Sequence, residues 1–413
     1  MSQSVQRKYD LYSQAAMANP FPTFAKMRRD DPIFRQPGLD GKTMIWFVSR
    51  YEDVATILRN DTIFVRDQRN VLPPEKWWAP DPTEALLNEH MLNRDGDAHR
   101  RLRLLVTKAF TPRMVRQMEP RIQAVADQLI DRVYAQGKMD LAAEFSFHLP
   151  TIVLAEMLGI PDHDLEKFKV WSNATLQPPR SQAEAVEMQQ HIREFVTYLQ
   201  TLIGFKRDHP ADDLLTGLIQ AEEAGDKLQG HELISMVMLL IVAGHETTVN
   251  LINNAVLALC AFPDQMALLK ADPSLMPQAV EEFLRYEGSV ERVFSRWAAQ
   301  DFELDGNLIR KGELVVCLIG SANRDESQFE QADVLNVERA GSRDHSRHMG
   351  FGHGVHYCVG APLARMETAI ALNSLLQRLP NLQTAVPREE LQWRMLPGFR
   401  SVEALPIVWD TKA

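Results

Sequence analysis

Cys358 is the residue whose surroundings point most clearly to chemistry. It lies in a segment, FGHGVHYCVG at residues 351–360, in which glycines alternate with bulky residues. Glycines at this density let a loop bend closely around another group. Pro362 follows and opens an apolar helix pattern, so the sulfur is expected at a helix N-terminus. That position favours a thiolate, because backbone N–H groups and the helix dipole stabilise negative charge.

Two other interpretations of Cys358 stay open on these residues alone. An isolated cysteine is most often a buried structural thiol, although the neighbouring glycines weaken that interpretation. A zinc site is the second, since five ligand-capable residues fall within fourteen positions: His345, His348, His353, His356 and Cys358. Zinc explains neither the glycines nor the distant motifs below. A G-x-G-x-x-G dinucleotide motif fails, because Tyr357 stands where its third glycine would be.

Written as F-G-x-G-x-H-x-C-x-G, the segment resembles the haem-thiolate loop of cytochrome P450 monooxygenases. The resemblance implies haem b as the cofactor, with Cys358 as the proximal ligand of its iron. It also implies that Phe351, Gly352, His356 and Gly360 contact the haem, and that His356 hydrogen bonds a propionate. A thiolate pushes electron density onto iron and favours O–O cleavage.

The stretch AGHETT at residues 243–248 resembles the family's oxygen-activating motif. Gly244 costs about 1 kcal/mol inside a helix, which suggests that something flat approaches the backbone at Ala243 and Gly244. Thr247 can bond back to the carbonyl of Ala243 one turn earlier and loosen the helix. Glu246 and Thr247 would then form an acid–alcohol pair that relays protons to dioxygen. The family often has aspartate at the position of Glu246.

A third motif is structural. Glu282 and Arg285 stand three residues apart, and an isolated pair of this kind is usually a surface ion pair worth under about 0.5 kcal/mol. In family context the pair matches the E-x-x-R element, and Arg339 matches the arginine that joins it. The resemblance implies a buried network that holds the fold and the haem loop.

Haem propionates are carboxylates, which need cationic partners when they are buried. The residues at positions that the family uses for this purpose are His99, Arg103, Arg296 and His356. The resemblance also implies an apolar substrate pocket, expected to be lined by Leu239, Ala243, Val290, Val293, Phe294 and Leu396.

Helices must position most of these residues. Apolar residues recur at helical spacing in residues 118–134, 183–205, 231–262, 276–286 and 362–379. Strand signals are few and fall at residues 44–48, 302–304, 307–309, 314–319 and 401–408. The expected fold is mainly α with a small β region. The resemblance implies the cytochrome P450 fold, with a large helical lobe and a smaller β-containing lobe around a buried haem, as one domain over residues 1–413 without a fused reductase or ferredoxin.

The run at residues 231–262 is also long enough to span a membrane, at about 1.5 Å per residue. His245 and Glu246 lie in its middle, where a bilayer would make them costly. We therefore expect this helix to be buried in protein.

The overall charge excludes one class of partner. The chain has 45 basic and 55 acidic residues, a net charge of −10. Phosphate backbones bind positively charged surfaces, so nucleic acid is not an expected partner.

The first ten residues contain no apolar stretch long enough for a signal peptide or membrane anchor. A cytoplasmic monomer is expected.

Monooxygenation consumes two electrons, and the sequence shows no flavin or nicotinamide motif. Three cysteines are too few for an iron–sulfur cluster. A separate ferredoxin or flavodoxin, with its reductase, is therefore the expected electron donor. A basic region defines a candidate docking site, and within it Glu119 is the only acid: Arg100, Arg101, Arg103, Lys108, Arg113, Arg116 and Arg121. A solvated basic helix face is the alternative interpretation.

Three functional hypotheses follow. The first is an oxidoreductase of secondary metabolism that uses O2 to hydroxylate or epoxidise an apolar small molecule. The second is a peroxide-driven relative, which the presence of both Glu246 and Thr247 argues against. The third is a haem protein that binds or senses a ligand without turnover.

Overall fold

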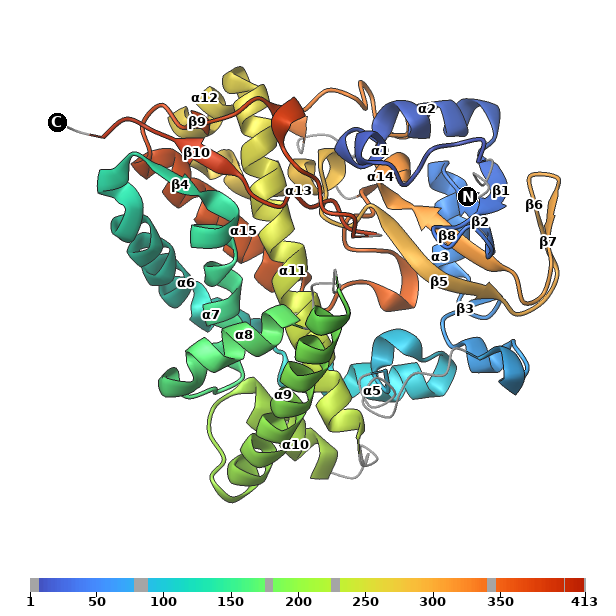
Figure 1. Ribbon diagram of the computed structural model, residues 1–413, viewed down its shortest axis with the longest axis horizontal. Helices are drawn as coiled ribbons and strands as arrows, with labels where there is room; N and C mark the ends of the chain where they lie inside the picture. The colour runs from blue at the N-terminus through green and yellow to red at the C-terminus, as the bar shows by residue number, and fades with distance from the viewer. Residues whose placement is uncertain are drawn as a thin grey trace.

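The computed structural model describes residues 7–77, 88–174, 181–223, 231–339, 347–396 and 398–411. Within this part of the chain, helices fill one side of the molecule and a mixed sheet lies on the other (Figure 1). The long helix α11 (Glu232–Ala261) runs between the two sides. The fold is therefore mainly α with a smaller β region, as predicted.

The predicted helices are present with small shifts at their ends. Residues 276–286 coincide with α13, while 118–134 form only the later part of α6, which begins at Pro112 because the Thr111 side chain caps its first turn. The remaining helices follow from the same periodicity. Besides α11, their bounds are α1 Gln14–Ala18, α2 Phe21–Asp30, α3 Tyr51–Arg59, α5 Gly96–Ala109, α6 Pro112–Val133, α7 His148–Met157, α8 Leu165–Ala174, α9 Gln182–Asp208, α10 Leu214–Glu223, α12 Pro263–Ala271, α13 Met276–Tyr286, α14 Ile319–Ala322 and α15 Ala361–Arg378.

The strands form three described sheets. The largest has the order β1-β2-β8-β5-β3, with β2 and β8 parallel and the other pairs antiparallel. A second sheet has the order β4-β10-β9, and β6 pairs with β7 in a hairpin. The bounds are β1 Ile33–Pro37, β2 Met44–Val48, β3 Phe64–Val65, β4 Lys138–Asp140, β5 Arg292–Ala298, β6 Phe302–Leu304, β7 Asn307–Ile309, β8 Leu314–Leu318, β9 Gln383–Thr384 and β10 Pro406–Val408.

Two strand predictions were too long. Ile319 belongs to α14 rather than to β8. In residues 401–408 only Pro406–Val408 form a strand, because Val402 instead bridges Trp393 within a hairpin. We call residues 394–396 and 398–401 the C-terminal hairpin, since Arg394 N donates to Ser401 O at 2.8 Å.

The core explains why α11 is so apolar. Its C-terminal half packs with α6, α13 and α15 in one hydrophobic cluster, and its N-terminal half packs with α5, α8, α9 and α10 in another. Among the described residues it is the one helix long and apolar enough to cross a membrane, and 67% of its apolar window is buried inside the protein. This burial agrees with the expected core helix.

Candidate active site

The loop before α15 has a backbone conformation that needs glycine. Cys358 N donates to Phe351 O at 2.9 Å and closes the loop. Gly352 and Gly354 have φ angles of 76° and 73°, in the left-handed region that favours glycine. A Cβ at Gly354 would stand 2.5 Å from the carbonyl oxygen of Leu58 on α3. The glycines therefore let the loop turn tightly and pack against α3.

The sulfur of Cys358 lies at the N-terminus of α15, where Gly360 is the N-cap residue. Burial among protein atoms raises the pKa of this thiol and outweighs the lowering by the backbone amides of Gly360 and Ala361 and by Arg103. The amides at the helix N-terminus therefore lower the thiol pKa as expected, while desolvation opposes them and is the larger effect. A bound metal ion deprotonates a ligating thiol outright. Since Cys358 is also solvent-accessible, it suits a metal ligand better than a free nucleophile.

The middle of α11 has the predicted back-bond. Thr247 Oγ1 donates to Ala243 O at 2.7 Å. Ala243 is exposed although Ile241 and His245 beside it are buried, so this turn presents one open face.

The protein around Gly244 does not itself require a glycine there, so the approach of a flat group to this residue stays a prediction. A Cβ at Gly244 would meet the Leu154 side chain at 3.6 Å, an ordinary contact. The residue that offers an open surface to a flat group is Ala243, one position earlier.

Glu246 is buried and has partners of its own. Its Oε1 accepts a hydrogen bond from Arg394 Nη1 at 2.7 Å and another from Asn250 Nδ2 at 3.1 Å. Glu246 and Thr247 are therefore adjacent in the sequence, but their side chains form hydrogen bonds with different partners and not with each other. Arg394 comes from the C-terminal hairpin, and no motif in the sequence signals it.

A second buried acid escaped the sequence analysis. Glu367 on α15 is 1% exposed. Burial raises its pKa to about 8, although a hydrogen bond with the Thr248 side chain of α11 opposes this. Glu367 is therefore a neutral acid between α11 and α15 at pH 7. An acid on the apolar face of a predicted helix is the signal that could have revealed it.

The E-x-x-R residues meet as expected. Arg285 donates to both carboxylate oxygens of Glu282, at 2.7 and 2.8 Å. Arg339 Nε lies 3.1 Å from each of the same oxygens. Arg285 also donates to the carbonyls of Asn323 and Ala332, so one buried carboxylate orients two arginines that hold the segment leading to the cysteine loop.

The predicted propionate partners lie around that loop. The rings of His99 and His356 are 4.2 Å apart between centroids, and Arg103 Nη2 donates to Tyr357 O at 2.7 Å. Arg296 is 2% exposed and donates to Phe64 O at 3.3 Å. His99 Nε2, His356 Nε2 and Arg296 Nε are buried without a hydrogen-bond partner among the described residues.

The expected pocket residues are only partly brought together. Val290 bridges Phe399 of the C-terminal hairpin, and a Cβ at Gly398 would stand 2.8 Å from the Phe294 ring. Leu239 is buried on α11, and Val293 and Leu396 are half-buried. Two surface hollows of about 370 and 580 Å³ lie elsewhere, beside Arg378 and Trp171, and include none of these residues.

The zinc alternative finds no support in the described residues, where no group of three or more His, Cys, Asp and Glu side chains could hold a metal ion. His345 lies outside the described residues. His348 Nε2 is instead 2.9 Å from Glu281 Oε2.

These observations fit a dianionic, metal-containing cofactor. The buried arginine and histidine side chains have nitrogens without hydrogen-bond partners in the described residues, and these suit carboxylates. The accessible thiol suits a metal. A mainly helical fold with this arrangement suits a protein that holds a haem through a cysteine thiolate.

Comparisons with known proteins agree. Residues 153–388 match the family model described as cytochrome P450. A cytochrome P450 of Bacillus subtilis is 42% identical over 96% of this chain and 96% of its own. The solved structure of the B. subtilis bacillaene polyketide synthase cytochrome P450 PksS has a TM-score of 0.89 at 38% identity and covers 97% of this chain and 100% of its own. The structure of myxobacterial CYP267B1 in complex with myristic acid has a TM-score of 0.88 at 39% identity, with 97% and 98% covered.

This chain belongs to the cytochrome P450 family. It is an oxidoreductase, a monooxygenase of the bacterial type.

Proposed function

We propose that this chain is a single-domain, haem b-dependent monooxygenase of the cytoplasm that acts as a monomer. It would hydroxylate or epoxidise an apolar small molecule with O2 and with electrons from a separate ferredoxin or flavodoxin and its reductase. The observation that carries the proposal is the arrangement around Cys358, where an accessible thiol lies near buried arginine and histidine nitrogens that lack hydrogen-bond partners in the described residues. When bound, the haem supplies the iron at which dioxygen is reduced and one oxygen atom is transferred.

The chain's own residues divide this work. Cys358 would ligate the iron, with Phe351, Gly352 and Gly360 shaping the loop around it. His99, Arg103, Arg296 and His356 would hold the propionates. Thr247 would present its hydroxyl beside the open face at Ala243, where it can hold and pass on a proton.

Glu246 is the proposed source of that proton. Arg394 and Asn250 hold its carboxylate. Glu246 must therefore rotate away from Arg394 and take up a proton from solvent before it can donate that proton to Thr247. Replacement of Thr247 by Ala removes the hydroxyl, and we expect electrons to be diverted to hydrogen peroxide while their consumption continues. The ratio of product to electrons consumed measures this. Wild-type coupling in Thr247→Ala would contradict the relay.

A long acyl chain is the proposed substrate class. PksS is named for polyketide biosynthesis, and CYP267B1 was solved with myristic acid. The expected pocket residues of this chain are aliphatic or aromatic, which suits such chains. Titration with myristic acid should shift the spin state of the haem, and an unchanged spectrum would exclude this fatty acid as a ligand.

The basic region at residues 100–121 is the proposed docking surface for the electron donor. Three of its arginines contact carboxylates, namely Arg100 with Asp97, Arg101 with Glu232 and Arg121 with Glu156. The exposed Lys108, Arg113 and Arg116 are better placed to attract an acidic partner.

Charge reversal tests this surface. Arg113→Glu and Arg116→Glu should slow reduction by a ferredoxin at low salt, whereas Arg193→Glu, an exposed control on α9, should not. Equal rates for all three variants would contradict docking here.

The absorbance spectrum of the purified, dithionite-reduced protein with carbon monoxide tests the function as a whole. Thiolate ligation predicts a strongly red-shifted Soret band that Cys358→Ser loses while it keeps its helical circular dichroism. A protein without haem, or one whose wild type has a short-wavelength band, would contradict the proposal. Product formation that needs added peroxide rather than electrons would indicate the peroxide-driven alternative, and no turnover with either would indicate a ligand-binding protein.

A further inference from the structure

Two arginines meet where β3 and β5 pair. In this antiparallel pair Phe64 lies opposite Ala298 and Val65 opposite Trp297. The same register, continued by one residue, places Arg66 opposite Arg296. Directly opposed side chains have Cβ atoms about 4.5–5.5 Å apart, and like charges there destabilise the pair.

Arg66 is held in this place by several hydrogen bonds. Its Nε donates to Leu92 O at 2.9 Å and its Nη1 to Phe294 O at 2.6 Å. Its backbone N donates to Asp95 Oδ1 at 2.7 Å. These bonds hold the guanidinium group of Arg66 in one position next to β3, the edge strand of the sheet.

Carboxylates of the described chain do not neutralise the two guanidinium groups. The carboxylate of Asp95 binds the backbone of Arg66 and not its guanidinium group. Its oxygens accept hydrogen bonds from the backbone amides of Arg66 and Asp67 and from the Asn70 side chain. Among the described residues, neither Arg66 nor Arg296 forms an ion pair. Burial, together with the charge of Arg296, lowers the pKa of Arg66 to about 9.

Arg66 lies next to elements that meet the cysteine loop. Asp95, which accepts a hydrogen bond from Arg66 N, is the N-cap residue of α5, and the ring of His99 on α5 lies 4.2 Å from that of His356 in the loop. Arg296 is 2% exposed and Arg66 is half-buried. Cations without a compensating charge in such surroundings are costly, so the two guanidinium groups need an anion.

We propose that Arg66 and Arg296 clamp one propionate carboxylate of the haem, and that Arg66 raises the reduction potential of the iron. This inference rests on the proposed function. The family resemblance assigns the propionates to four other positions, so Arg66 is an additional ligand of this chain. A fixed positive charge favours the ferrous state, which carries one positive charge fewer than the ferric state.

Two substitutions separate the charge of Arg66 from its packing. Arg66→Gln removes the charge, and Arg66→Lys keeps it but loses the paired hydrogen bonds to Leu92 and Phe294. Arg69→Gln is the matched control, because Arg69 lies on the same loop and is exposed beside Asp67. The readouts are the midpoint potential, from titration with redox dyes, and the rate of haem transfer to apomyoglobin.

We expect Arg66→Gln to lower the midpoint potential and to speed haem transfer by about tenfold, the effect of one charge-assisted hydrogen bond. Arg66→Lys should restore the potential, and Arg69→Gln should match the wild type. A potential in Arg66→Lys as low as in Arg66→Gln, or wild-type values in Arg66→Gln, would overturn the proposal. If Arg66→Gln does not fold, Arg66→Met, which also lacks the charge, takes its place with the same expected and contradicting results.

Failure of the proposed function is recognised separately. It shows in the carbon monoxide spectrum of the wild type, which is recorded before any Arg66 variant is compared.

Discussion

Two titratable residues in this protein have raised pKa values because the protein atoms around them keep water from part of the charged form. Cys358 and Glu367 illustrate the effect, since burial raises the pKa of both. For the cysteine the consequence is a need for a cation, which the proposed iron would supply. For the glutamic acid it is neutrality at pH 7. Desolvation of the charged form therefore favours metal ligation at Cys358 and the neutral acid at Glu367.

The buried Glu367 gives a pH-dependent prediction. Its pKa is raised from 4.5 to about 8, so between these values the folded protein keeps a proton that the unfolded chain loses. Its contribution to stability is complete below pH 4.5 and declines as the pH rises toward 8. Glu367→Gln lacks this dependence. From pH 5 to pH 7 we expect its free energy of unfolding, relative to wild type, to improve by about 2 kcal/mol.

Urea unfolding followed by circular dichroism measures the effect of Glu367→Gln. Glu119→Gln, on the exposed face of α6, is the control and should show no such trend. A constant difference between Glu367→Gln and wild type across this pH range would show that Glu367 is ionised in the folded protein.

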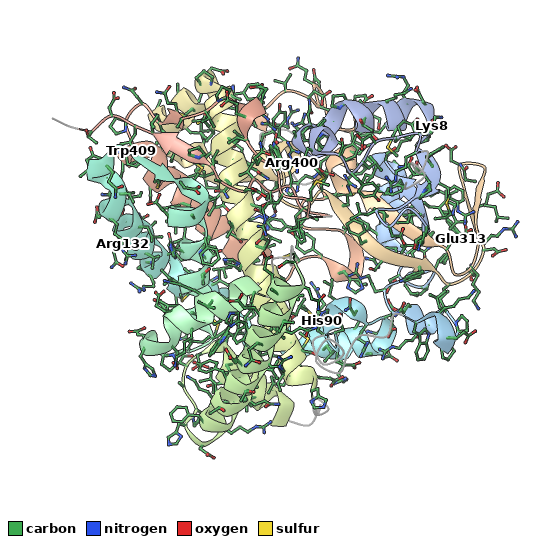
Figure 2. The ribbon with its side chains drawn as sticks, in the orientation of Figure 1. Lys8, His90, Arg132, Glu313, Arg400 and Trp409 are labelled. Atoms are coloured by element: carbon green, nitrogen blue, oxygen red, sulfur yellow. The ribbon has the colours of Figure 1, made fainter. Side chains whose placement is uncertain are left out.

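At the level of elements, α11 is joined to the C-terminal hairpin through polar contacts. Arg394 reaches Glu246, and Asn254 Nδ2 donates to Arg400 O at 3.0 Å. Arg400 lies beside α11 (Figure 2) and its Nε donates to the buried Glu287 at 2.7 Å. The hairpin that carries Leu396 is thereby connected to the helix that carries the proposed proton donor.

A double-mutant cycle tests this connection. Arg394→Met leaves the Glu246 carboxylate buried without its cation, and we expect a loss of about 2 kcal/mol, below the usual cost for a fully buried pair because Arg394 is 20% exposed. In the background of Glu246→Gln the same change should cost less. Unfolding free energies of the four proteins give the coupling. Additive losses would mean that the ion pair contributes nothing.

Gly244 offers a second test on α11. Since an added Cβ makes only ordinary contact with Leu154, Gly244→Ala should stabilise the helix by about 1 kcal/mol and raise the thermal unfolding temperature. The carbon monoxide band should stay unchanged, because the open face lies at Ala243. A loss of haem from Gly244→Ala would show that the cofactor approaches the backbone at Gly244.

For the whole molecule, the Glu282 network connects segments that are far apart in the sequence. Arg285 binds carbonyls of residues 323 and 332, and Arg339 joins through the same carboxylate. Because this network is buried on α13 between the helical side and the cysteine loop, it stabilises the arrangement of both rather than one element.

Removal of Arg285 should therefore affect assembly. Arg285→Ala leaves Glu282 buried and removes the hydrogen-bond donors to three backbone carbonyls, at a cost of about 3–5 kcal/mol. We therefore expect no stable holoprotein. The haem-to-protein ratio after purification measures this. Arg121→Ala, which breaks the more exposed ion pair with Glu156, is the control. A haem-replete Arg285→Ala would contradict the structural role.

The sequence by itself determined the parts that rest on local pattern. The mainly helical fold, the length of α11, the position of Cys358 before α15 and the Thr247 back-bond all follow from periodicity, glycine conformation and spacing along one element. These features depend on residues within a few turns of each other, so the chain alone specifies them.

Only the tertiary structure decided which distant groups meet and how they ionise. Arg394 beside Glu246, Arg66 opposite Arg296 and the neutral Glu367 all depend on the packing of separate segments. The same packing acts on the pKa of the Cys358 thiol, because desolvation by the atoms around the sulfur opposes the effect of the amides at the start of α15.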